Sequence, residues 1–305
     1  MRVLIDTDPG LGQQNADVDD GLALFLMLNN PKFQIEGITT VFGNTSVTKG
    51  HELVNKYLSL AEKREIPNIM GAKNRRKLGK PTEASEFLVQ KVKENPNELT
   101  LITLGPFTNV STALMEYPAF FDDLKEIVIM AGLLSPIFMV NPHFNRFYEK
   151  MPLQQILCEF NSFRDPEATK IALEAETQTP RIQMGLEVCC KIIITEQHLQ
   201  KIESVNKPIP QFIVKDTRKW IGIQESFWGI KGFFPFDTCV PIYLLAPELF
   251  KSTDLYLEVD TEDIPGKYSI TKEKKNSAPL SYCFDFHDDS AKEQFIDILI
   301  SNLIK

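Results

Sequence analysis

The chain has 305 residues, 43% of them hydrophobic, and a formal net charge of −8. A chain of this size can bury a large core, and with no convincing linker we expect one α/β domain over residues 1–305. Because Lys and Arg form no long block, the charge disfavours nucleic acid as the main partner and favours a small-molecule ligand.

The amino terminus and the cysteines indicate the compartment. The first residues reach acidic side chains too early for a signal peptide, and no apolar run reaches membrane-spanning length. We therefore expect a cytoplasmic protein with no membrane partner. The five cysteines are an odd number without a CxxC pair, which predicts buried free thiols.

Short β-branched runs alternate with longer amphipathic segments along the first 131 residues. The pattern predicts strands at 2–7, 35–42, 68–72, 99–104 and 126–131, with helices at 21–29, 48–62, 84–94 and 109–116 between them. This alternation is typical of an open, mostly parallel Rossmann-like sheet flanked by helices, with the active site at the carboxyl ends of the strands.

The second half of the chain is less regular. Residues 133–157 carry three prolines among aromatic residues, which predicts a long surface loop or a short helical excursion. Beyond it we expect helices at 165–175, 211–223 and 290–304, and strands at 181–185 and 255–259.

Acidic residues gather where the first strand ends and the next helix begins. They are Asp6, Asp8, Asp17, Asp19 and Asp20, and Asn44 follows the second strand. Such dense carboxylates repel one another unless a cation neutralises them, and the lack of nearby His or Cys favours Ca²⁺ or Mg²⁺ over zinc. The alternative is that Asp19 and Asp20 only stabilise a helix start, which leaves Asp6 and Asp8 unexplained.

Asp237 lies far downstream, just before the apolar helical run 240–246. Taken alone, an acid at this place is typical of a helix cap. A carboxylate that arrives from a distant segment is also what a closed calcium shell needs.

Taken in order, the motifs resemble the inosine-uridine-preferring nucleoside hydrolase family over nearly the whole chain. They are DTDPG at 6–10, DD at 19–20, VFGN at 41–44, LGPFTN at 104–109, IMAG at 129–132, CEFN at 158–161, DPEA at 165–168 and Asp237. No single motif is diagnostic, but their shared order is specific. The resemblance implies an N-glycosyl hydrolase that cleaves ribonucleosides and, by analogy, forms a homo-oligomer.

The resemblance also implies roles for individual residues. The expected ligands of Ca²⁺ are the carboxylates of Asp8, Asp20 and Asp237 and the main-chain carbonyl of Leu104, with water and two ribose hydroxyls in the remaining positions. The expected substrate contacts are Asp19, Asn44, Glu159, Asn161 and, at the pocket floor, Met130. The alternatives are loop polar groups for Glu159 and Asn161 and simple core packing for Met130.

The chemistry follows from such an arrangement. Cleavage of an N-glycosidic bond places oxocarbenium character on the ribose, which surrounding carboxylates stabilise. A metal-bound water serves as nucleophile, and Asp8, which touches both metal and water, is the expected general base.

Residues 11–18 form a longer connection than is usual in the family. Insertions cost little loop-closure entropy, so the metal site survives if the two ends still meet. We expect Gln13, Gln14, Asn15 and Asp17 at the pocket rim, with Asp17 as an alternative ligand.

The second departure concerns activation of the leaving base. Pyrimidine-accepting members place a His directly before the late Asp, where this chain has Phe236. His143 in the long loop is an alternative proton donor, whereas His51 and His198 fall on expected helices. The aromatic residues near Asp237, which are Trp220, Phe227, Trp228 and Phe236, favour stacking on a purine, with Trp220 as the preferred candidate, unless they only pack the core.

Three functional hypotheses follow. The first is a purine-preferring, calcium-dependent nucleoside hydrolase. The second keeps N-ribohydrolase chemistry on another ribosyl substrate, and the third is a non-catalytic calcium-dependent ribose-binding protein. The intact Asp8 base counts against the third.

Overall fold

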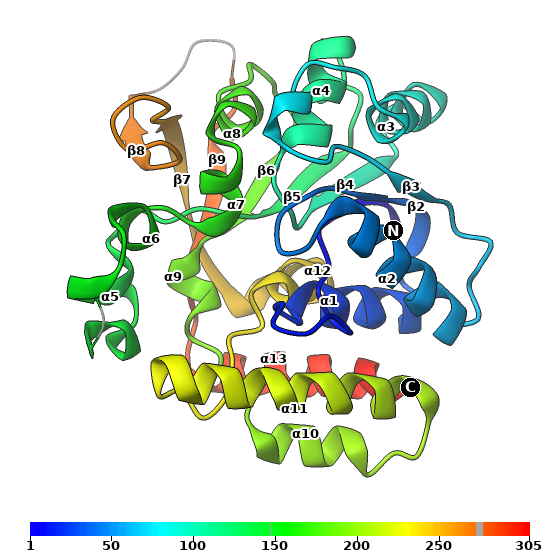
Figure 1. Ribbon diagram of the computed structural model, residues 1–305. Helices are drawn as coiled ribbons and strands as arrows, with labels where there is room; N and C mark the ends of the chain where they lie inside the picture. Colours follow the sequence, from blue (N-terminus) through cyan, green and yellow to red (C-terminus); the bar gives the residue numbers. More distant parts are fainter. Residues whose placement is uncertain (147, 273–276) are drawn as a thin grey trace.

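The computed structural model describes residues 1–146, 148–272 and 277–305, which are built around one open, mostly parallel sheet (Figure 1). The strand order in the described residues is β3-β2-β1-β4-β5-β6-β9-β7-β8. The strands are β1 (Arg2–Thr7), β2 (Gln34–Thr40), β3 (Asn68–Met70), β4 (Leu99–Thr103), β5 (Glu126–Met130), β6 (Arg181–Met184), β7 (Phe250–Val259), β8 (Tyr268–Thr271) and β9 (Leu280–Phe286). Only β7 and β8 run antiparallel to their neighbours, so the predicted fold class is confirmed.

Helices cover both faces of the sheet. One face carries α1 (Asp19–Asn29), α2 (Val47–Leu60), α12 (Cys239–Leu245) and α13 (Asp289–Leu303). The other carries α3 (Glu83–Glu94), α4 (Thr108–Glu116) and α8 (Pro166–Leu173). A further pair, α10 (Glu196–Glu203) and α11 (Pro208–Trp228), packs outside α13 (Figure 1).

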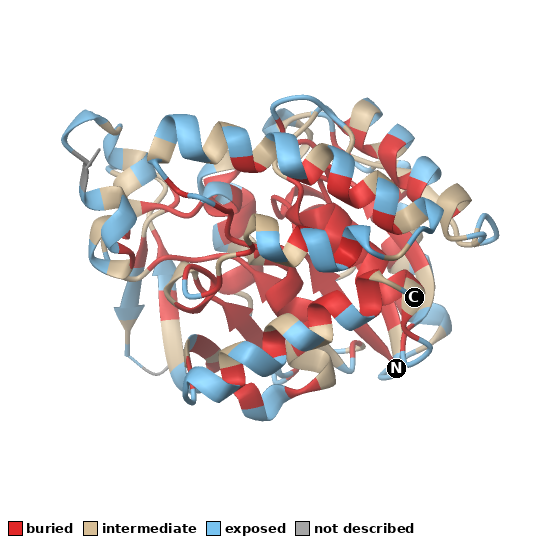
Figure 2. Ribbon diagram, turned by 90° about the horizontal axis from the view of Figure 1, so that it is seen from below, coloured by how far each residue is buried: buried red, intermediate tan, exposed pale blue. Residues whose placement is uncertain are grey.

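Side-chain alternation along the strands explains the two cores. Val3 and Ile5 point into the core beneath α1, whereas Leu4 between them points into the core beneath α3 and α4. Both faces of a strand are therefore apolar, which is typical of a parallel sheet covered on both sides. Figure 2 shows buried residues concentrated in the central strands, while the outer helices alternate buried and exposed positions.

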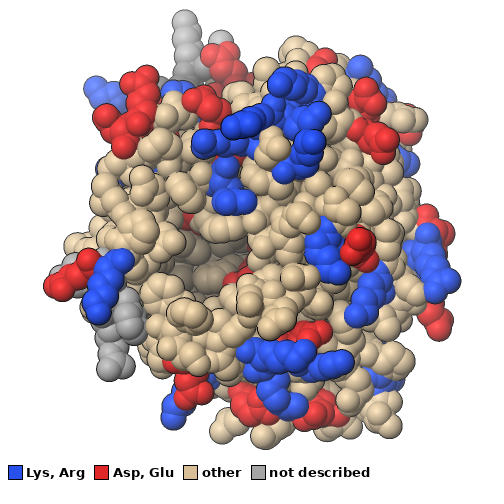
Figure 3. Space-filling view, viewed as in Figure 1, with Lys and Arg blue, Asp and Glu red and all other residues tan. Residues whose placement is uncertain are grey.

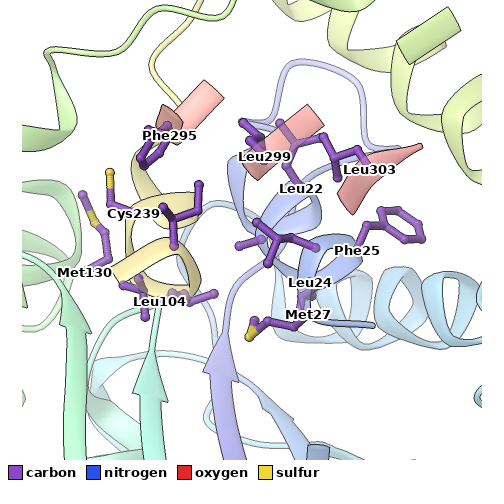
Figure 4. Close-up of a cluster of buried hydrophobic side chains, with 14 of the residues drawn as sticks. Leu22, Leu24, Phe25, Met27, Leu104, Met130, Cys239, Phe295, Leu299 and Leu303 are labelled. Atoms are coloured by element: carbon purple, nitrogen blue, oxygen red, sulfur yellow. The ribbon is translucent and has the colours of Figure 1, made fainter. Parts of the chain in front are cut away.

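Helix α1 is buried nearly all round because α12 and α13 cover the side that faces away from the sheet. Figure 4 shows its side chains packed against α13, α12 and the ends of β4 and β5; the labelled residues are Leu22, Leu24, Phe25, Met27, Leu104, Met130, Cys239, Phe295, Leu299 and Leu303. This packing fixes the start of α1, where Asp19 and Asp20 lie, against the strand ends.

The proline-rich segment 133–157 forms a short helical excursion, one of the two predicted outcomes. It contains α5 (Ile137–Val140), two 3₁₀ turns (Pro142–Arg146 and Tyr148–Lys150) and α6 (Leu153–Leu157), while Phe147 lies outside the described residues. The remaining short elements are η1 (Arg75–Lys77), α7 (Phe160–Arg164), α9 (Leu186–Cys189), η4 (Phe236–Thr238) and η5 (Pro247–Leu249).

Several element boundaries differ from the sequence-based predictions. The helix expected at 211–223 runs from Pro208 to Trp228, since proline fits the first turn of a helix and Gly229 ends it in a left-handed conformation. The strand expected at 255–259 begins at Phe250, where its first half pairs with β9.

All five cysteines are free and buried, as predicted. Across the residues that the structure describes, no helix combines the length and apolar character needed to cross a membrane.

Candidate active site

The carboxyl ends of the central parallel strands open into a cavity of about 600 Å³. Asp8 follows β1, Asn44 follows β2, Leu104 follows β4 and Met130 ends β5; all four line this cavity. Asp237, in η4, reaches the same cavity from the last third of the chain. Figure 3 shows the hollow at the surface, with acidic atoms at its edge.

Three buried carboxylates converge at the start of α1. Asp19, Asp20 and Asp237 each place an oxygen within 4.8 Å of the others. The Asp237 N–H donates to Oδ2 of Asp19 at 3.2 Å, and the Asp8 N–H donates to Oδ1 of Asp20 at 3.3 Å. The N-cap of α1 is Val18, which makes no side-chain capping bond. Asp19 and Asp20 do lie in the first turn of α1, where acids are favourable, but their carboxylates also meet Asp8 and Asp237 from distant segments.

Asp8 lies beside this group in a cradle of backbone. The Asn44 N–H donates to its Oδ2 at 2.5 Å. A β-carbon on Gly43 would overlap Oδ2, and one on Gly105 would lie 2.8 Å from Oδ1. Glycine at both positions therefore lets two loops close directly on the carboxylate.

The buried carboxylates of this cluster repel one another, and a bound cation would relieve that repulsion. Burial raises the pKa of Asp8 well above its usual range, and repulsion from Asp20 raises it further. Burial, followed by repulsion from Asp19, Asp20 and Asp8, does the same to the pKa of Asp237. Within the described part of the chain, no Lys, Arg or His forms an ion pair with any of these carboxylates. An all-oxygen donor set with this much uncompensated charge fits a hard divalent cation.

Glu159 and Asn161 lie at the start of α7 and line the same cavity. The Glu159 carboxylate caps this helix by accepting from the N–H groups of Asn161 and Ser162 at 2.7 and 3.0 Å. The Asn161 amide donates to the carbonyls of Leu104 at 2.6 Å and Met130 at 3.3 Å. These hydrogen bonds hold both side chains in place at the cavity, and they tie Asn161 to the Leu104 carbonyl.

Met130 lies both in the core and at the cavity, so its contact with substrate stays a prediction. Its side chain is buried in the core beneath α1 and also lines the cavity.

Asp6 lies behind the cavity and is not among its lining residues. Its Oδ1 accepts from the Thr39 hydroxyl at 2.5 Å and from the Asn109 amide at 2.8 Å. Burial raises the pKa of Asp6 to about 7. The acidic cluster in the sequence therefore divides into a supporting residue beneath Asp8 and the carboxylates that face the cavity.

The 11–18 connection meets the site only through its second half. The Asn44 side chain bonds the Asp17 backbone, accepting from its N–H at 3.0 Å and donating to its carbonyl at 3.1 Å. Asn15 and Asp17 line the cavity as expected, but Gln13 and Gln14 do not. The expectation for these two was wrong because they lie in the turn that the Gln13 N–H closes on the Gly10 carbonyl, before the chain returns to the cavity at Asn15.

Aromatic residues line the end of the cavity near Asp237. Trp220, Trp228 and Phe236 are among the lining residues, and Nε1 of Trp220 is buried with no hydrogen-bond partner in the described residues. Phe227, expected in this group, is 69% exposed because it lies on the outer side of α11. His143 is also exposed and does not line the cavity.

Sequence reasoning missed Gln154, Gln155 and Arg164, which also line the cavity. Arg164 lies one helical turn after Asn161, a spacing that could have indicated it. The two glutamines belong to α6, and no pattern in the 133–157 segment shows which side of that short helix faces inward.

Sequence comparisons relate the chain to known nucleoside hydrolases. The sequence model of a family described as inosine-uridine preferring nucleoside hydrolase matches residues 3–293. A probable uridine nucleosidase 2 from Arabidopsis thaliana is 29% identical, over 86% of this chain and 83% of its own. A pyrimidine-specific ribonucleoside hydrolase from Enterobacter sp. (strain 638) is 25% identical, over 99% of this chain and 97% of its own.

Solved structures share the fold at lower identity. A plant nucleoside hydrolase superposes with a TM-score of 0.82 at 20% identity, covering 99% of this chain and 98% of that chain. A purine-preferring ribonucleoside hydrolase from Gardnerella vaginalis gives a TM-score of 0.82 at 19% identity, covering 99% of each chain. The names of these proteins include both purine and pyrimidine preferences.

Proposed function

This chain belongs to the inosine-uridine preferring nucleoside hydrolase family, and we propose that it is a calcium-dependent N-ribohydrolase that prefers purine ribonucleosides. The predicted enzyme class, a nucleoside hydrolase, is confirmed by the family; the metal and the preferred base are the proposal. The observation that carries it is a single cavity lined both by uncompensated buried carboxylates and by aromatic rings, which meet near Asp237.

Asp8, Asp20, Asp237 and the Leu104 carbonyl would hold the ion. Asp19, which lies within reach of Asp20 and Asp237, would contact the ribose hydroxyls together with Asn44. When bound, Ca²⁺ supplies the charge that holds two adjacent ribose hydroxyls and makes a neighbouring water more acidic. Glu159 and Asn161 would hold the rest of the sugar beside Met130, whose carbonyl Asn161 contacts.

Bond cleavage then needs a base and charge stabilisation. Water attacks C1′ while the C1′–N bond breaks. The electron pair of that bond leaves with the nucleobase. The Asp8 carboxylate accepts the proton from this water, and the surrounding carboxylates stabilise the positive charge that develops on the ribose. The departing base takes up a proton, so the products are ribose and free base.

The aromatic end of the cavity supports a purine preference. Phe236, directly before Asp237, cannot donate a proton, and among the described lining residues there is no histidine. A purine has an imidazole nitrogen that can be protonated by solvent, and stacking against Trp220 would raise its basicity. Uridine and cytidine lack that nitrogen and gain less from stacking.

A panel of inosine, guanosine, adenosine, uridine and cytidine tests the proposal, with released base measured by chromatography. The panel is run with excess calcium, after chelation, and after separate readdition of calcium or magnesium. We expect purine cleavage that disappears on chelation and returns best with calcium. Cleavage that survives chelation contradicts metal dependence, and uridine cleaved as fast as inosine contradicts the purine preference. Calcium-dependent ribose binding without any cleavage would instead support the binding-protein hypothesis.

A further inference from the structure

A second cavity of about 520 Å³ adjoins the nucleoside cavity, and its lining is basic. The two cavities share Asn44, Phe163 and Arg164 as walls. The second also reaches Lys73 and Arg75, which come from the segment between β3 and α3. Figure 3 shows Lys and Arg side chains gathered above the hollow, where Figure 1 draws the cyan segment and α7.

Arg164 stands at the boundary between the two cavities and is held by aromatic rings. Its guanidinium lies 5.6 Å from the ring centre of Phe42 and 5.5 Å from that of Phe160. Its Nε is buried with no hydrogen-bond partner in the described residues. Such contacts fix the direction of the side chain but leave its donors available.

The cations of this second cavity form no ion pair within the described residues. Lys73 and Arg75 are exposed and Arg164 is half-buried. Arg75 attracts the Asp165 carboxylate and so lowers its pKa, but that carboxylate accepts its hydrogen bonds from the Thr108 hydroxyl at 2.5 Å and the Ala168 N–H at 3.2 Å.

The remaining lining is also suited to an anion. Thr45 and Ser46 bring hydroxyl-bearing residues to the cavity, and Ser46 is the N-cap of the 14-residue helix α2. The start of a helix carries partial positive charge, which adds to that of the three cations. Three cations, two hydroxyl-bearing residues and a helix start around one cavity are together suited to a negative ligand.

Resting on the proposed function, we propose that this basic cavity binds the phosphate of a ribonucleoside 5′-monophosphate, so that nucleotides are substrates of the same site. A nucleoside carries 2′, 3′ and 5′ hydroxyls, and only the vicinal 2′ and 3′ pair can chelate one metal ion. The 5′ position is therefore the one left to carry a substituent. Asn44 and Arg164 connect the ribose end of the first cavity to the cations of the second.

Two measurements test the subsite, one of which does not depend on turnover. Ribose 5-phosphate and ribose are titrated calorimetrically into the calcium-loaded protein, and inosine 5′-monophosphate is compared with inosine as substrate. The test variant is Lys73→Gln/Arg75→Gln. The matched control is Arg76→Gln/Lys77→Gln, which removes the same two charges from neighbouring residues that do not line this cavity.

We expect the phosphorylated sugar to bind about 10- to 100-fold more tightly than ribose, as charge-assisted hydrogen bonds provide. That advantage should shrink at high salt and disappear in Lys73→Gln/Arg75→Gln, while Arg76→Gln/Lys77→Gln retains it. Lys73→Gln/Arg75→Gln should keep the kcat/KM of the wild-type protein for inosine.

Equal binding of the two sugars overturns the proposal, as does an advantage that Lys73→Gln/Arg75→Gln retains. Tight, variant-sensitive binding of ribose 5-phosphate without cleavage of any nucleoside or nucleotide supports the subsite and defeats the proposed hydrolase activity. Cleavage of inosine, with ribose 5-phosphate bound no more tightly than ribose, supports the hydrolase activity and defeats the phosphate subsite.

Discussion

Replacing Gly43 by Ala should disable the site without unfolding the protein. The new β-carbon would overlap Oδ2 of Asp8, whereas the backbone of Gly43 does not have positive φ and so accepts alanine without strain. The carboxylate must move by about 1 Å, and a displacement of that size costs about 10²-fold in rate. Turnover at saturating calcium measures the loss, and thermal unfolding measures stability. Gly222→Ala is the matched control, because no atom lies within 4 Å of its β-carbon.

A double-mutant cycle shows whether Gly43→Ala acts through Asp8. Asp8→Asn keeps the shape of the side chain but removes the base, so adding Gly43→Ala to it should lower the rate little further. Wild-type turnover in Gly43→Ala would refute the cradle as a requirement for catalysis. A full additional loss in the double variant would show that Gly43 acts elsewhere.

Three further predictions concern catalysis and stability. Asp8→Asn should lower kcat by about 10²–10⁴, while its unfolding temperature holds or rises because a buried charge is removed; unchanged turnover would exclude Asp8 as the base. The ion-free protein should lose stability as pH rises, because burial raises the pKa of Asp6 to about 7 and raises that of Asp237, so the folded state binds protons more tightly than the unfolded one. The loss of stability begins above the pKa of an unfolded Asp, about 4, and is complete once pH exceeds the folded pKa values. Urea unfolding at pH 5 and pH 8 measures this loss, which calcium should reduce. Higher stability at pH 8 than at pH 5 without calcium contradicts the reasoning. Trp220→Ala should slow inosine cleavage sharply and His143→Ala should not, since only Trp220 lines the cavity; the reverse result would make His143 the proton donor.

Local patterns in the sequence determined the fold class and most of the candidate site. Apolar runs such as that of β1 alternate with amphipathic segments, and the parallel-sheet rule then brings the residues after each strand to one edge. Asp8 and Asn44 are therefore placed together by the sequence pattern alone, whereas Leu104 was identified through the family resemblance. The same reasoning locates Asp19 and Asp20, because they begin the helix that follows the first strand.

Long-range packing decided the rest. Asp6 and Asp8 are two residues apart and look alike in the sequence, but strand geometry puts Asp6 beneath the cavity and only the residue beyond the strand end inside it. Phe227 and Trp228 are adjacent, yet the rotation of α11 exposes one and turns the other inward. The basic cavity joins segments around residues 45, 74 and 164, whose meeting depends on how β2, β3 and α7 are packed rather than on any local pattern. Tertiary structure decides such features because a side chain's direction depends on contacts distant in sequence.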